Sequence, residues 1–128
     1  MKSISIIGGT GMKKLFAHPH YQEFGFKEVS NEDMRVHTQY GSVPVTEQIL
    51  IKGAELFRLQ FIHRHHGLGT TPPHALNHQA NVSASTEGDP SLILSIHSVG
   101  SLVESFPPGT LGMVADYIDM SGSATTFF

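Results

Sequence analysis

The feature that most constrains the fold is a series of short apolar segments, each followed by a loop of small or polar residues. Residues 3–7 (SISII) predict a short buried strand, which the glycines of GGTGM end. Residues 43–51 and 56–63 are rich in β-branched and aromatic side chains and are separated by KGAE. This pattern predicts an antiparallel hairpin.

A helix is predicted after the loop RHHGLGTTPP, because proline is tolerated in the first helical turn. It would run from about His74 to Thr86 and stop at Gly88. At helical spacing one face would carry Leu76, Ala80, Ser83 and Ala84.

Two more strands are predicted after this helix. Residues 91–97 (SLILSIH) are apolar enough for a strand that is buried on both faces. A turn at 106–110 (FPPGT) precedes another strand at 111–119 (LGMVADYID). Residues 13–33 support no assignment. The order of elements predicts an α/β fold with at least one crossover.

Composition bounds the class of protein. The 128 residues fit one domain, 1–128, with 39% hydrophobic residues, 15% charged residues and a net charge of -3. The chain has no cysteine, which excludes disulfides and cysteine-based zinc sites. We find no signal peptide, no apolar run that could span a membrane and no basic block for nucleic acid. We therefore expect a cytoplasmic protein with a small-molecule partner, and neither a nucleic-acid nor a membrane partner.

Three loops are expected at the carboxyl ends of strands, where α/β sheets bind ligands: 8–12, 64–71 and 98–101. In the first, Gly8, Gly9 and Gly11 surround Thr10, and such a loop can present N–H groups and a hydroxyl to an anion. It is neither a dinucleotide fingerprint nor a P-loop, and the alternative is a plain turn.

The second loop carries Arg64, whose planar, permanently charged fork suits phosphate. His65 and His66 add donors whose charge responds to a bound anion. The alternative is a solvated basic loop.

A metal site is the competing interpretation of the histidines. His74 and His78 are four residues apart and could share a helix face, but residue 75 is Ala and not the Glu of H-E-x-x-H. We therefore predict no metal site.

The third loop follows His97 and contains Ser98 and Gly100. Small residues after a strand leave backbone N–H groups available to an anion, although a tight connection would look the same. Spacing supports no Ser-His-Asp arrangement and no G-x-S-x-G elbow, so His97 is not assigned as the base of a nucleophile.

The segments IIGGTGM, RHHGLGTTPPHALNHQAN, SVGSL and PPGTLGMVADYIDMSG together resemble the N-terminal half of methylthioadenosine phosphorylases, within the trimeric purine nucleoside phosphorylase family. The resemblance covers nearly the whole chain, and residues 13–35 match poorly. It implies a mixed twisted sheet with flanking helices, in a truncated form. It also implies purine salvage by a glycosyltransferase: phosphate cleaves the glycosidic bond of a nucleoside such as 5'-methylthioadenosine and gives free base and (methylthio)ribose 1-phosphate. No metal or organic cofactor is implied, only inorganic phosphate as co-substrate.

The resemblance implies a role for individual residues. Thr10 and Arg64 would bind phosphate, and Ser98 would offer it a backbone N–H. His65 matches the histidine of the methylthioadenosine branch, whereas His66 falls where the purine nucleoside branch places its phosphate histidine. Both stay candidates.

Two positions depart from the family. Gly69 stands where a His near the 5' substituent is common, and His97, close to the ribose, stands where Thr or Asn is usual. These departures leave the 5' substituent and the sugar contacts open.

The family's second half carries the base-binding residues and completes the sheet. We therefore expect this chain to need a complementary C-terminal chain, or to form a homo-oligomer, a trimer by resemblance. We do not expect catalysis by this chain alone. The alternative hypothesis is a non-catalytic anion-binding, nucleoside-binding or assembly protein of the same fold, and a histidine-rich metal binder is the least favoured.

Overall fold

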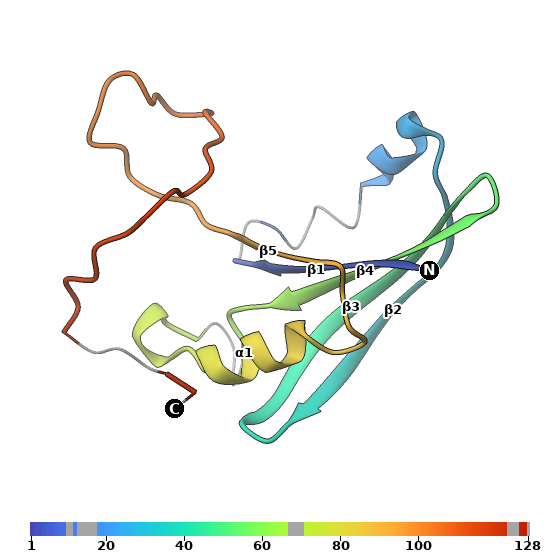
Figure 1. Ribbon diagram of the computed structural model, residues 1–128, viewed down its shortest axis with the longest axis horizontal. Helices are drawn as coiled ribbons and strands as arrows, with labels where there is room; N and C mark the ends of the chain where they lie inside the picture. The colour runs from blue at the N-terminus through green and yellow to red at the C-terminus, as the bar shows by residue number, and fades with distance from the viewer. Residues whose placement is uncertain (10–11, 13–17, 67–70, 123–125, 128) are drawn as a thin grey trace. The chain divides into compact units, whose positions relative to one another are not determined.

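The computed structural model describes residues 1–9, 12, 18–66, 71–122 and 126–127. Its contacts divide the chain into two units, residues 1–97 and 98–128, which are described separately. The first unit contains every helix and strand that the structure assigns (Figure 1). The prediction of one domain over residues 1–128 stays a prediction.

The first unit is built on a mixed five-stranded sheet in the order β2-β3-β4-β1-β5. β1 pairs in parallel with both β4 and β5, whereas β2–β3 and β3–β4 are antiparallel. The mixed sheet of the predicted α/β fold is therefore confirmed. The strands are β1 (Lys2–Gly8), β2 (Lys27–Thr38), β3 (Gly41–Lys52), β4 (Glu55–His63) and β5 (Leu92–Ile96).

The hairpin predicted from residues 43–63 is confirmed, with Val45 opposite Ile62 and Lys52 opposite Glu55. β2 had no counterpart among the sequence predictions. Most of its side chains are exposed and polar, whereas Val36 belongs to the buried core and Met34 packs against it. Pairing with β3, rather than a local apolar pattern, makes this segment a strand.

The predicted helix exists but starts later than expected. A 3-10 turn, η3 (Pro73–Ala75), is followed by extended backbone at Leu76, and the helix α1 spans His78–Ser85. Asn77 is the reason, because its side chain accepts a hydrogen bond from the backbone N–H of Ala80 at 2.9 Å and so caps the helix there. The predicted start at His74 was therefore wrong. Within the described part of the chain, no helix has the length and apolar character needed to cross a membrane.

α1 packs against one face of the sheet (Figure 1). Its small buried residues, Ala80 and Ala84, allow close approach to the strands. Leu76, expected on this face, precedes the helix and is half-buried. The core between α1 and the sheet consists of Ile7, Val36, Val43, Val45, Ile62, Ala80 and Ala84.

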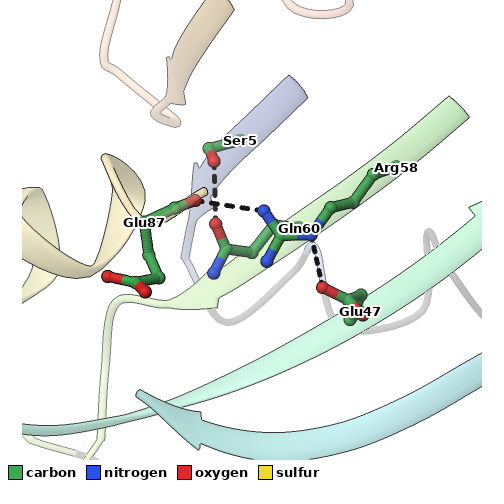
Figure 2. A network of polar contacts seen from close by, with 5 residues as sticks. All are labelled: Ser5, Glu47, Arg58, Gln60 and Glu87. Carbon is green, nitrogen blue, oxygen red and sulfur yellow. Dashed lines mark hydrogen bonds and ion pairs between the residues drawn. The ribbon is translucent and has the colours of Figure 1, made fainter. Parts of the chain in front are cut away.

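A polar network continues this face toward the end of the helix (Figure 2). Ser5 Oγ donates to Gln60 Oε1 at 2.9 Å, and both residues are fully buried. Arg58 donates through Nε to the Glu47 carboxylate and through Nη1 to the backbone carbonyl of Glu87 at 3.0 Å. The network therefore ties the turn after α1 to β3 and β4.

β5 forms as predicted, but the prediction that it is buried on both faces was wrong. Leu92, Ile93 and Leu94 are 47%, 40% and 41% exposed. In the described sheet β5 is an outer strand that pairs with β1. No described strand lies on the side of β5 away from β1 to cover its apolar side chains.

The second unit has turns but no helix or strand in its described residues, 98–122 and 126–127. The turn expected at 106–110 is confirmed by a hydrogen bond from Thr110 N to Pro107 O, 3.1 Å long. The strand predicted at 111–119 was wrong, because the described chain gives this segment no pairing partner. Its apolar side chains, such as Met113 at 98% exposure, remain in solvent.

Candidate functional site

Three parallel strands end together at one edge of the sheet. Gly8 is the last residue of β1, and it pairs with His63 at the end of β4 and with Ile96 at the end of β5. The residues that follow, Gly9, Arg64 and His97, therefore leave the sheet side by side. This placement confirms that the loops after β1 and β4 share the carboxyl edge, where α/β sheets bind ligands.

Arg64 is fixed by its backbone on both sides. Its N–H donates to Gly8 O at 3.1 Å, and its carbonyl accepts from Asn81 Nδ2 of α1 at 3.1 Å. A helix and the central strand thus hold the position from which the guanidinium extends.

The Arg64 guanidinium lies directly against Gly9. A Cβ placed on Gly9 would be only 2.7 Å from Arg64 Nη2, closer than real Cβ contacts allow. Gly8 has a different role, because its Cβ would be 2.6 Å from Cζ of Phe61. The missing side chains leave room for these groups: Gly8 accommodates an aromatic ring, and Gly9 lets the guanidinium lie against the backbone.

The guanidinium then reaches across the end of β1 to His97. Arg64 Nη1 contacts His97 Nδ1, and His97 Nε2 lies 2.7 Å from Ser95 Oγ. Arginine can only donate, so Nδ1 must be the acceptor. The single proton of the neutral imidazole is consequently on Nε2, which donates to the serine hydroxyl.

The electrostatics agree with this tautomer. Partial desolvation lowers the pKa of His97 below its ordinary value of 6.5, and the charges of Arg64 and the nearby His78 lower this pKa further. His97 is therefore a neutral acceptor at neutral pH, and the net charge of the pair is that of the arginine.

One buried donor of the guanidinium has no protein partner in the described part of the chain. Arg64 Nε is buried and makes no hydrogen bond there. A buried N–H of a cation without an acceptor is costly, and an oxyanion would satisfy it. The arrangement can therefore bind an anion through Nε and the neighbouring terminal nitrogens.

His65 and His66 are tied to the protein through one ring nitrogen each. His65 Nδ1 donates to Thr71 O at 2.7 Å, which leaves Nε2 as the atom that could meet a ligand. His66 Nε2 donates to Asn81 Oδ1 at 2.9 Å, which leaves Nδ1 for that role. The phosphate role predicted for either histidine stays a prediction.

Comparison with known proteins gives this geometry a context. No model of a known protein family matches the sequence. The chain is 37% identical over 123 residues to the S-methyl-5'-thioadenosine phosphorylase of Pyrococcus abyssi, covering 94% of this chain and 42% of that protein. It is 35% identical over 118 residues to a probable 6-oxopurine nucleoside phosphorylase of Dictyoglomus turgidum, covering 92% and 40%.

A third relative is the probable S-methyl-5'-thioinosine phosphorylase of Methanothermobacter thermautotrophicus, which is 30% identical over 125 residues, covering 98% of this chain and 40% of that protein. The resemblance to the methylthioadenosine phosphorylases is confirmed. The chain spans about two fifths of the length of these curated relatives, with 40% to 42% of each protein covered.

The phosphorylase resemblance also predicts roles at the site for residues of the first and third loops, which the structure does not test. Thr10 and Gly11 lie outside the described residues. Ser98 and Gly100 belong to the second unit, which is described separately. Their predicted roles stay predictions.

The prediction that His74 and His78 both belong to one helix, where they could share a face, was wrong. His74 lies in η3 and His78 is the first residue of α1, with extended backbone between them. Among the residues that the structure describes, no group of three or more His, Cys, Asp or Glu could hold a metal ion.

The sequence analysis assigned no role to three residues that build the site. Asn81 connects α1 to the Arg64 carbonyl and to His66, and it is only 2% exposed. Asn77 caps the helix and also donates to Tyr40 O at 2.8 Å. Ser95 orients His97. The strong preference of asparagine for helix N-caps could have identified Asn77, whereas Asn81 and Ser95 carry no local signal.

Proposed function

We propose that this chain provides the phosphate-binding part of an enzyme that uses phosphate to cleave the glycosidic bond of a purine nucleoside such as 5'-methylthioadenosine. The products would be free base and (methylthio)ribose 1-phosphate. The observation that carries the proposal is Arg64, a cation at the shared ends of three parallel strands with a buried N–H that lacks a described partner. The names of the three relatives, all phosphorylases of purine nucleosides, support the same reaction.

Arg64 would act by holding the nucleophile. As the bond from the sugar C1' to the purine breaks, its electron pair leaves with the base, and a phosphate oxygen forms the new bond to C1'. Gly8 and Asn81 hold the Arg64 backbone and Gly9 leaves room for the guanidinium, so the cation lies where it would orient the phosphate. Protonation of the leaving purine and the base contacts would come from a complementary C-terminal half.

An additional chain or copy would complete the protein. Leu92, Ile93 and Leu94 on the outer strand β5 are partly exposed, which supports pairing with a further strand. The proposed partners are therefore nucleoside, phosphate and either a C-terminal chain or further copies in a homo-oligomer. No other cofactor is proposed, and a cytoplasmic location stays a prediction.

The test is phosphate-dependent release of adenine from 5'-methylthioadenosine. The purified chain is assayed alone and after co-expression with the remaining C-terminal part of a curated relative. We expect activity with the complement, and none when phosphate is omitted. Arg64→Ala should weaken phosphate binding by about 2 kcal/mol, roughly 30-fold, because a charge-assisted contact is lost. The matched control is Arg35→Ala, which removes an exposed arginine of β2.

A second candidate is a non-catalytic anion-binding or assembly protein, favoured by the exposed apolar residues of β5. Phosphate binding that depends on Arg64, without adenine release under any condition, would support this candidate over the enzyme. If neither phosphate nor sulfate binds, both proposals for the site are wrong.

A further inference from the structure

We propose that His97 is a positioning residue for Arg64, and that it couples anion binding at the guanidinium to the uptake of one proton. The inference rests on the anion site of the proposed function and adds to it. It starts from the contacts Arg64 Nη1 to His97 Nδ1 and His97 Nε2 to Ser95 Oγ. Neither the resemblance nor the names of the relatives assign this residue such a role.

Without a bound anion, neutral His97 accepts the hydrogen bond that the guanidinium would otherwise donate to the anion. The guanidinium has five N–H donors and no acceptor, so it can contact Nδ1 only while this nitrogen lacks a proton. Because Arg64 must donate to Nδ1, the proton of neutral His97 is on Nε2, and the Ser95 hydroxyl accepts it at 2.7 Å. The contact keeps the long arginine side chain over Gly9, ready for an anion.

A bound tetrahedral oxyanion with two negative charges would favour protonated His97 over neutral His97. The anion takes over the donors of Arg64, and its negative charge outweighs the positive charge that disfavours imidazolium. His97 then gains a proton on Nδ1 from solvent and becomes a second donor to the anion. The balance is one neutral imidazole plus one proton giving one imidazolium.

The surrounding charges set the direction of the effect. Arg64, at the end of β4, and His78, at the start of α1, face His97 and lower its pKa in the empty site. A bound dianion offsets both, so binding raises the pKa. By linkage, anion affinity must then rise as pH falls through the range in which His97 titrates, by up to about tenfold per pH unit.

The experiment measures sulfate binding by isothermal titration calorimetry between about pH 8 and pH 5, where histidine titrates and sulfate keeps both charges. The test variant is His97→Asn, whose amide oxygen can still accept from Arg64 but cannot take up a proton. The matched control is His37→Asn, which removes an exposed histidine of β2. We expect affinity to rise toward low pH in the wild type and in the control, and this rise to be lost in His97→Asn.

A second measurement does not depend on the anion. In ligand-free protein labelled at the histidine ring nitrogens, NMR titration should show His97 as the Nε2–H tautomer, with a pKa below the ordinary value. Arg64→Gln removes the positive charge and should raise this pKa, whereas Arg35→Gln should leave it unchanged. An Nδ1–H tautomer in the wild type would overturn the inference.

The two proposals fail in distinguishable ways. If sulfate binds and Arg64→Ala weakens binding, but wild type and His97→Asn have the same pH dependence, the proton coupling is wrong and the anion site stands. If sulfate binding is absent, or is unaffected by Arg64→Ala, the anion site and the inference fall together.

Discussion

Arg64 and His97 are 33 positions apart in the sequence, yet the guanidinium of the first donates to the imidazole of the second across the end of β1. The contact is possible because β4 and β5 both pair in parallel with β1, which places their carboxyl ends on either side of Gly8. Gly9 lies beneath the guanidinium and has no side chain to obstruct it. The candidate site is thus a direct product of the strand order.

Gly9→Ala should reduce anion affinity with little change in stability. The added Cβ would approach Arg64 Nη2 to 2.7 Å, and the flexible end of the arginine can move away at small cost. We expect sulfate affinity, measured by calorimetry, to fall roughly tenfold as the guanidinium is displaced.

The control for this prediction is a double-mutant cycle. In an Arg64→Ala background there is no guanidinium to displace, so Gly9→Ala should cause no further loss. An equal loss of affinity in both backgrounds would show that Gly9 acts independently of Arg64.

Ser5→Ala should destabilise the sheet more than its size suggests. Ser5 Oγ donates to Gln60 Oε1 in a fully buried pair, and its removal leaves the amide oxygen unsatisfied. We expect the free energy of unfolding, from urea denaturation, to fall by about 1–3 kcal/mol. Ser91→Ala, which removes an exposed hydroxyl, should be close to neutral.

Replacing both partners should recover stability. Gln60 Nε2 is already buried without a hydrogen bond in the described part of the chain. Ser5→Ala combined with Gln60→Leu removes every polar atom of the pair, so the double variant should be more stable than Ser5→Ala alone. A double variant less stable than the single one would contradict this account.

Asn77→Ala should lower the free energy of unfolding by about 1 kcal/mol because the helix cap is lost. Loss of the hydrogen bond to Tyr40 O should lower it further. Asn77→Asp keeps an oxygen for the Ala80 N–H but removes the donor to Tyr40, so it should fall between the wild type and Asn77→Ala. Thermal denaturation followed by circular dichroism provides the ranking. Equal midpoints for the two variants would mean that the cap contributes nothing.

Ligand-free stability should depend on pH through His97. Its pKa is lowered in the folded protein, so the unfolded chain binds the proton more tightly. The stabilising contribution is complete above the ordinary value of 6.5 and is lost as pH falls from there through the lower folded pKa. We therefore expect the wild type to lose more stability than His97→Asn between about pH 7.5 and pH 5 in urea denaturation. The same loss in both proteins would exclude His97 as the cause.

Local patterns were sufficient for part of this fold. β1, the β3–β4 hairpin and the end of α1 follow from apolar runs and glycine positions. The start of α1 was missed because two prolines suggested an earlier entrance, whereas Asn77 supplies the cap. β2 and the exposure of β5 could not be predicted, since pairing and neighbours decide them rather than composition.

The candidate site was likewise predicted only in part. Arg64 was predicted from its place after a strand, and the shared edge followed from general rules for α/β sheets. Its contact with His97 depends on the register of β5 against β1, which no short segment encodes. The role of Asn81 was not predicted, because it consists of two hydrogen bonds to residues that are distant in the sequence.

The position of β1 between β4 and β5 has a kinetic consequence. β1 is synthesised first but must wait for β4, whose residues pair with it at a separation of about 55 positions, and then for β5. Non-local parallel pairing of this kind is slow to form. Arg64 can meet His97 only once the last strand is in place, so the gain of sulfate affinity during refolding would time the final step of sheet assembly.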